Sequence, residues 1–217
     1  MCMPSRTLRL ATVLLVSGAL ASVALSAQSS WEFEPLDASG TVTYFIADGE
    51  PESVYRPADR DLATWVLRAW EHSVGGALRF KSSSEDEVLI HVYWVTPDAG
   101  LYGEMQPVTV NGLSSADVYV RPDTSVGGEE ISRRARTDSL FRDTVVYLTC
   151  LHELGHALGL AHTDDFADIM YFFGVGGNIP GFFNRYWIRL DNRDSIAGIS
   201  GLSPGDIGRV RALYPSP

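Results

Sequence analysis

An α+β fold with a mixed, mostly parallel sheet is predicted by the order of elements along the chain. Short β-branched and aromatic segments dominate the first part of the sequence, and two clear helical patterns lie late in it. The 217 residues are 45% hydrophobic and 20% charged, the composition of an ordinary globular domain. Because a chain of this size buries roughly 70% of its unfolded surface, one domain can form its core without disulfides.

The first 27 residues are predicted to be a secretory signal peptide. Arg6 and Arg9 precede an apolar run from Leu10 to Leu25, and small residues suitable for cleavage follow around Ala27. Serine and glycine within the run make it short for a bilayer span, which favours cleavage over an uncleaved anchor. The chain is therefore expected to be secreted.

After cleavage, residues 28–40 are predicted to be a short lead-in segment and residues 41–217 the folded domain. The mature chain would keep one cysteine, Cys150, because Cys2 leaves with the signal peptide. Export without an intramolecular disulfide indicates an extracellular or bacterial periplasmic protein. The formal net charge of −10 argues against nucleic acid or a membrane surface as partner. We expect a monomer that has no membrane attachment once the signal is cleaved.

Several strands and one helix are predicted in the first half of the domain. The strands are the β-branched and aromatic segments Thr41–Ala47, Leu78–Phe80, Val88–Val95 and Ala116–Arg121. The third is apolar on both faces, which predicts a central position. Apolar residues at helical spacing predict an amphipathic helix between Pro57 and Ser73. Residues 96–115 are predicted to be rich in loops, with one short strand near Leu101–Met105.

Two further helices are predicted in the second half. The longest apolar stripe runs from Ser139 to Leu160 and stops at Gly159, a residue free to adopt positive φ. The last helix begins at Ser203-Pro204, with serine as N-cap and proline at the first helical position. Opposed charge blocks predict a solvated loop over residues 123–136. Residues 172–201 are rich in glycine and aromatic residues and show no clear periodicity.

A histidine cluster is the strongest functional signal in the sequence. His152 and His156 lie about 40° apart on one helical face, so both imidazoles can bind one metal ion. Gly159 lets the chain leave the helix, so that His162 can approach the same ion. Three neutral imidazoles suit Zn²⁺ and leave one position for water, as in a catalytic site. Glu153 is predicted to take a proton from that water as it attacks a carbonyl, and to pass the proton to the leaving amine.

The cluster also carries a family resemblance. The string His152-Glu153-x-x-His156-x-x-Gly159-x-x-His162 resembles the elongated zinc motif of the metzincin metallopeptidases. Asp168-Ile169-Met170-Tyr171 resembles their Met-turn. The eight-residue step from His162 to Met170 and the closing segment Leu202–Tyr214 resemble the matrixin, or matrix metalloproteinase, branch. The chain departs from that branch at Thr163 and Phe172, where matrixins usually have serine and proline.

The resemblance implies a metzincin-like fold, in which an active-site helix and a C-terminal helix flank a zinc cleft beside a twisted sheet. It implies a secreted zinc-dependent endopeptidase that hydrolyses protein or peptide substrates by a zinc-bound water, with Glu153 as general base and acid. Met170 would form an apolar floor beneath the histidines. An extended peptide would pair with an edge strand at Leu101–Pro107. The aromatic residues between Phe172 and Trp187 would either form an apolar wall beside it or pack the core of a long loop.

Other residues are predicted to have structural roles. No cysteine lies between Cys2 and Cys150, so the inhibitory propeptide thiolate of matrixins has no counterpart. Cys150 is predicted to face the core. His72 and His91 are predicted to be structural, so the second zinc of many matrixins is not expected. Asp168 is predicted to fix the Met-turn through local hydrogen bonds.

Three points stay open from the sequence. Scattered carboxylates could bind Ca²⁺, but no loop has an ordered ligand spacing, so calcium is left as an optional second cofactor. A catalytically silent zinc-containing binding or adhesion module is an alternative to the peptidase. An amidase-like enzyme acting on another carbonyl substrate with the same residues is a third.

Overall fold

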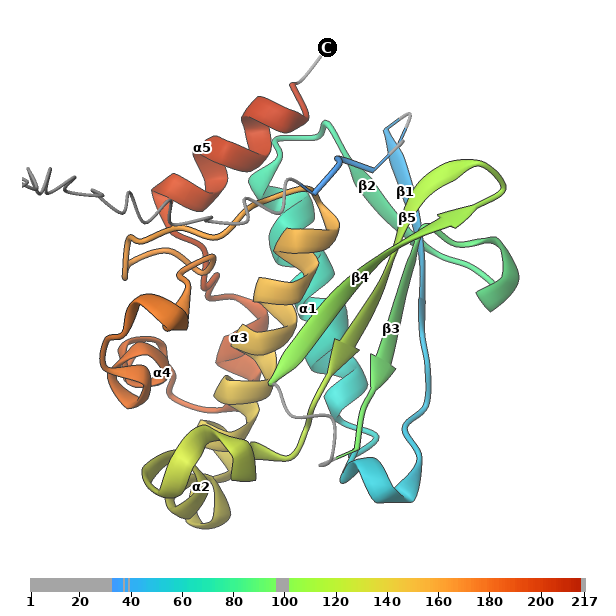
Figure 1. Ribbon diagram of the computed structural model, residues 1–217. Coiled ribbons are helices and arrows are strands. Elements are labelled where there is room, and N and C mark those ends of the chain that lie inside the picture. The colour runs from blue at the N-terminus through green and yellow to red at the C-terminus, as the bar shows by residue number, and fades with distance from the viewer. Residues whose placement is uncertain (1–32, 37, 39, 97–101, 216–217) are drawn as a thin grey trace, which may run out of the picture.

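The α+β architecture is confirmed by the computed structural model, which describes residues 33–36, 38, 40–96 and 102–215 (Figure 1). In these residues one sheet has the strand order β2-β1-β3-β5-β4. The strands are β1 (Thr41–Ile46), β2 (Arg79–Ser82), β3 (Ile90–Trp94), β4 (Gly103–Val110) and β5 (Leu113–Val120). β4 is antiparallel to β5, and the other neighbours are parallel. The predicted mixed, mostly parallel sheet is therefore correct, with β3 in its centre.

Helices α1 and α3 cover one face of the sheet, as Figure 1 shows. The α-helices are α1 (Asp59–Ser73), α2 (Gly128–Thr137), α3 (Ser139–Ala157), α4 (Ile179–Trp187) and α5 (Pro204–Leu213). Short 3₁₀ helices span Pro51–Ser53, Glu85–Glu87, Thr124–Gly127, Phe173–Val175 and Arg193–Ala197. The apolar sides of α1, α3 and the inner sheet face form one core, in which Val66, Val118 and Leu151 are fully buried.

Two polar contacts fix α3 against α1. The indole nitrogen of Trp70 donates to the backbone oxygen of Leu151 at 3.1 Å. Near the start of α3, both terminal nitrogens of Arg142 donate to the carboxylate of Asp59. Because both of these charged side chains are buried, removing Arg142 would leave the Asp59 charge without its cationic partner, at a cost of several kcal/mol. The helix that carries the histidines therefore has a fixed position in the core.

The predicted loop-rich stretch over residues 96–115 is wrong for its second half. β4 and β5 form a hairpin whose turn is Asn111-Gly112, with φ angles of 52° and 81°. Asn-Gly is the sequence favoured where both central residues of a two-residue hairpin turn need positive φ. Pro107 within β4 is tolerated because β4 is an edge strand. The predicted start at Leu101 lies outside the described residues.

Two regions predicted without regular structure contain helices. Over residues 123–136, the predicted solvated loop is mostly α2, which buries Ile131 and Ala135 and exposes its charges. Its acids lie in the first turn and its arginines in the last, as the helix dipole favours. Within residues 172–201, α4 starts at the N-cap Asn178, whose side chain accepts from the Gly181 N–H. Both helices are short, so their apolar residues repeat over too few turns to show a clear helical spacing.

The predicted beginning of the last helix is correct. Ser203 and Asp206 form a capping box, in which each side chain accepts a hydrogen bond from the other's backbone N–H. Cys150 is fully buried, as predicted, and burial raises the pKa of its thiol. No helix in the described ranges has the length and apolar composition that a bilayer span needs. The predicted signal peptide lies outside these ranges.

Candidate metal centre

Helix α3 carries the first two histidines and ends in a Schellman motif. The backbone N–H of Leu160 donates to Gly155 O at 3.0 Å, and that of Gly159 donates to His156 O at 2.8 Å. Gly159 has φ of +92°, a conformation that other residues rarely adopt. The chain reverses here and brings His162 back toward the helix.

The three histidines converge on one point. Their Nε2 atoms lie 3.1 Å apart for His156–His152, 3.1 Å for His156–His162 and 3.2 Å for His152–His162. Three imidazole nitrogens at 2.0–2.1 Å from a tetrahedral Zn²⁺ would be about 3.3 Å apart. The triangle formed by the three nitrogens therefore fits zinc. Among the described residues, these histidines form the one group with such convergent metal-binding atoms.

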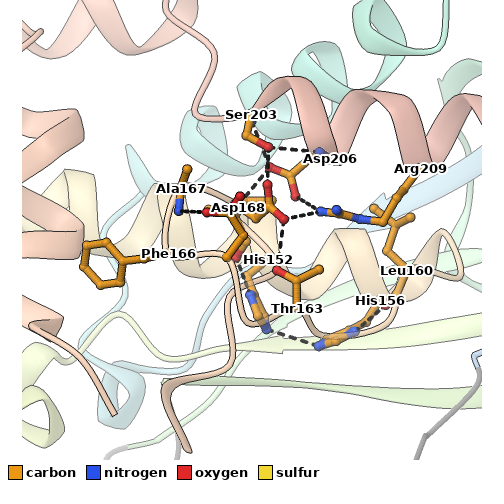
Figure 2. Close-up of polar contacts among 12 residues, drawn as sticks. His152, His156, Leu160, Thr163, Phe166, Ala167, Asp168, Ser203, Asp206 and Arg209 are labelled. Atoms are coloured by element: carbon orange, nitrogen blue, oxygen red, sulfur yellow. Dashed lines mark hydrogen bonds and ion pairs between the residues drawn. The ribbon is translucent and has the colours of Figure 1, made fainter. Parts of the chain in front are cut away.

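Hydrogen bonds orient two of the rings. His152 Nδ1 lies 2.7 Å from Ile169 O, and His156 Nδ1 lies 2.8 Å from Leu160 O (Figure 2). Because a carbonyl oxygen only accepts, each Nδ1 carries the hydrogen and each Nε2 presents a lone pair to the centre. Burial lowers the pKa of His152 to about 4 and that of His156 to about 2, and it also lowers the pKa of His162. Neutral imidazoles are the form that binds metals.

Met170 packs against a glycine of α3 that lies between the first two histidines. A Cβ atom built on Gly155 would lie 2.4 Å from Met170 Sδ and 3.2 Å from Trp70 Cζ2. Met170 is fully buried, so its thioether has no free space into which to move. Sequence analysis missed the role of Gly155. A glycine inside a helix costs about 1 kcal/mol relative to alanine, which indicates a packing or functional reason for it. Its position between two candidate ligands could therefore have pointed to a close contact at the metal centre.

The side chain of Glu153 extends from α3 toward the edge strand β4. Its side chain is only 8% exposed, and it accepts a hydrogen bond from the backbone N–H of Met105. Burial raises the pKa of Glu153 to about 8, and the nearby charge of Glu104 acts in the same direction. The carboxylate lines the same cleft as the three histidines.

A cleft of about 1070 Å³ passes the histidines and runs along β4. Its lining includes Gly103 to Thr109 of that strand and the aromatic residues Tyr102, Phe172, Phe173, Phe182 and Phe183. The predicted edge strand therefore borders the cleft. Of the aromatic residues predicted for the wall, four line it, whereas Tyr186 is buried and stacks on Tyr147.

The N-terminal end of the described chain also borders this cleft. The ring centroids of Phe33 and His156 are 4.6 Å apart. Leu36 is buried, and its backbone N–H donates to the hydroxyl of Tyr214 at 2.9 Å. Pro35 lies so close to Gly159 that a Cβ there would be 3.1 Å from Pro35 Cα. Residues 33–36 are thus held across the end of α3.

The comparison with known protein families adds the deciding observation. The family model described as Matrixin matches residues 35–180, which include the sheet, α3 and the three histidines. The chain belongs to the matrixin family. Matrixins bind zinc, and in this matrixin the triad that the family motif implies is present and convergent.

Curated relatives of this matrixin include two interstitial collagenases. The one from Sus scrofa is 28% identical over 74% of this chain and 31% of its own length. The one from Equus caballus is 25% identical over 80% of this chain and 31% of its own length. A neutrophil collagenase from Homo sapiens is 26% identical over 81% of this chain and 36% of its own length. The matrixin described here matches about a third of the length of these relatives.

The remaining histidines do not join the centre. His91 of β3 is buried, with Nδ1 2.9 Å from Asp117 Oδ1 and Nε2 2.8 Å from Glu85 O. His72 lies in the last turn of α1, where a cation is favoured by the helix dipole. The contacts of His91 are consistent with the structural role predicted for it, whereas the role of His72 stays a prediction.

Proposed function

We propose that this matrixin is a zinc-dependent endopeptidase, in which His152, His156 and His162 hold the ion. The observation that supports this most strongly is the triangle of Nε2 atoms, which matches the ligand spacing of a tetrahedral zinc site and leaves its cleft side open. When bound, zinc lowers the pKa of a water molecule toward about 7 and polarises a substrate carbonyl.

We propose Glu153 as the general base and acid. Its carboxylate faces the cleft beside the triad, within reach of a water that attacks a bound carbonyl. The N–H of Met105 partly opposes the burial that raises the pKa of Glu153, and so favours the charged form, which is the form that accepts a proton. The same carboxylate then returns the proton to the leaving nitrogen.

Peptide substrates are expected to bind in extended form. β4 pairs with β5 on one side only, so its other side offers backbone groups to an added strand. Phe173, Phe182 and Phe183 line the adjacent cleft and would receive an apolar side chain.

The test is hydrolysis of casein by the purified protein with and without a chelator. We expect cleavage that the chelator abolishes and added zinc restores. Glu153→Gln keeps the size and most of the packing of the side chain but removes the base, so it should retain zinc and lose most activity. Zinc binding without any hydrolysis by the parent protein would instead support the silent binding module.

Export and chain boundaries belong to the same proposal. We propose that residues 1–27 are a cleaved signal, that residues 28–40 lead into the domain at residues 41–217, and that the mature protein is a secreted or periplasmic monomer. Mass spectrometry of the exported product checks the cleavage, and light scattering checks the oligomeric state. A product that retains residues 1–27 would contradict the signal assignment.

A further inference from the structure

A buried polar network connects the C-terminal helix α5 to the histidine centre (Figure 2). The backbone of one residue, Ile169, joins the two. Its N–H donates to Asp206 Oδ2 of α5 at 2.8 Å, and its C=O accepts from His152 Nδ1 at 2.7 Å. A carboxylate of α5 therefore holds the backbone of the residue whose carbonyl orients the first histidine.

Asp168 holds the residue that follows the third histidine. Its Oδ2 accepts from the hydroxyl of Thr163, the residue after His162, at 3.0 Å. The backbone of Thr163 is also held to the Met-turn, by bonds of 2.8 Å to Met170 O and 2.9 Å from the Phe172 N–H. Among the described residues no hydrogen bond holds His162 Nδ1, so the position of this ring depends on the backbone beside it and on the Phe172 ring, whose centroid lies 4.8 Å away.

The N-cap and the first two turns of α5 form a socket for the Asp168 carboxylate. Ser203 Oγ donates to Asp168 Oδ1, and Arg209 Nη2 donates to Asp168 Oδ2 at 2.7 Å. A Cβ atom on Gly205 would lie 2.8 Å from Asp168 Oδ1, so the glycine leaves the space that the carboxylate occupies. The Asp168 carboxylate is therefore held by the hydroxyl of Ser203 and the guanidinium of Arg209, in space that Gly205 leaves free.

Arg209 is the shared counter-charge of two buried acids. The same Nη2 atom lies 2.7 Å from Asp168 Oδ2 and 2.8 Å from Asp206 Oδ1. The two acid side chains are 3% and 0% exposed, whereas that of Arg209 is 37% exposed. Two neighbouring carboxylates with so little solvent need a cation to stay ionised together. Removing Arg209 would disturb both acids, and through them both histidine contacts.

We propose that Asp168 and Arg209 are positioning residues, through which helix α5 sets the geometry of the histidine triad. His156, in contrast, is oriented by the Schellman turn of its own helix. The inference rests on the proposed function to the extent that the triad must bind zinc. It assigns to two residues, 41 positions apart in the chain, a role in the metal site that neither performs by contact.

The test compares zinc binding in full-length variants, using competition with a chromogenic chelator. Asp168→Asn and Arg209→Gln are each expected to raise the dissociation constant for zinc about ten- to a hundred-fold, the usual effect of losing groups that orient metal ligands. Arg211→Gln is the matched control. Arg211 lies on the same helix, but donates to Ser73 O of α1, so this variant should bind zinc within about twofold of the parent.

Cobalt substitution separates positioning from general destabilisation. The visible absorption of bound Co²⁺ reports ligand geometry, so Arg209→Gln should change its bands and Arg211→Gln should not, even if both lower the melting temperature of the metal-free protein. Should Asp168→Asn fail to fold, Arg209→Lys keeps a positive charge and is expected to give an intermediate zinc affinity.

Unchanged zinc affinity and an unchanged cobalt spectrum in Arg209→Gln would overturn the inference, whatever the effect on stability. A parent protein that binds no zinc would overturn the proposed function instead. The two failures are therefore distinguishable in one experiment.

Discussion

Gly103 of β4 lies directly against the Glu153 side chain of α3. A Cβ atom on Gly103 would be 2.7 Å from Glu153 Cγ and 3.0 Å from Glu153 Oε1. Real side chains essentially never approach so closely, so the glycine allows the edge strand and the carboxylate to share this space.

Gly103→Ala should therefore displace Glu153 while leaving the histidines in place. We expect kcat to fall by at least about tenfold, because small displacements of a catalytic group have large effects on rate. Zinc affinity should stay within about twofold. Steady-state kinetics with a peptide substrate, together with zinc competition, measure both quantities.

Gly208→Ala is the matched control for this change. A Cβ atom on Gly208, within α5, would meet no atom within 4 Å. This substitution should leave kcat unchanged and stabilise the helix by up to about 1 kcal/mol. Equal kcat values for both variants would show that Gly103 does not position Glu153.

Phe33→Ala should open one end of the cleft. The Phe33 ring packs on His156 and lines the same cleft as Glu153, so it occupies space that an extended substrate would need. We expect a several-fold lower KM for peptides that extend past His156, with little change in kcat, measured on the full mature chain. An unchanged KM would mean that residues 33–36 lie clear of the substrate path.

Acid should weaken the attachment of the Met-turn. Burial opposes the charge of Asp168, but hydrogen bonds from Ser203, Arg209 and Thr163 outweigh it and hold the pKa of this carboxyl below its ordinary value of 3.8. A lowered folded-state pKa contributes stability that is complete above the unfolded value and is lost as pH falls through the folded value.

Urea unfolding of the metal-free protein checks this pH dependence. The difference in unfolding free energy between the parent and Asp168→Asn should be constant above about pH 5 and shrink below about pH 4. A difference that stays constant down to pH 2 would contradict the lowered pKa. Metal-free protein is used so that zinc release does not contribute, and the histidines that both proteins share are compared in the difference between parent and variant.

The long helical pattern and the zinc motif could be predicted from sequence because each is local. The stripe of α3 spans five turns, and three of the five histidines lie within eleven residues. The turn at Gly159 follows from the residue type alone. These local features predict the active-site helix and the candidate metal centre.

Long-range contacts could not be predicted in this way. The contact of Gly103 with Glu153 depends on the register between an edge strand and a helix 50 positions away. The link from Asp168 to Arg209 joins the Met-turn to the last helix across 41 positions. β4 itself was only partly predicted, because its alternation is weak and Pro107 interrupts it. Packing, not local preference, decides these positions.

X-ray absorption at the zinc edge tests the central claim most directly. The geometry of the triad predicts three imidazole nitrogens at about 2.0–2.1 Å and one further light-atom neighbour from solvent. His156→Ala should remove one imidazole contribution or abolish zinc binding. A zinc ion with fewer than three imidazoles in the parent protein, or one closed by a fourth side chain, would contradict the account.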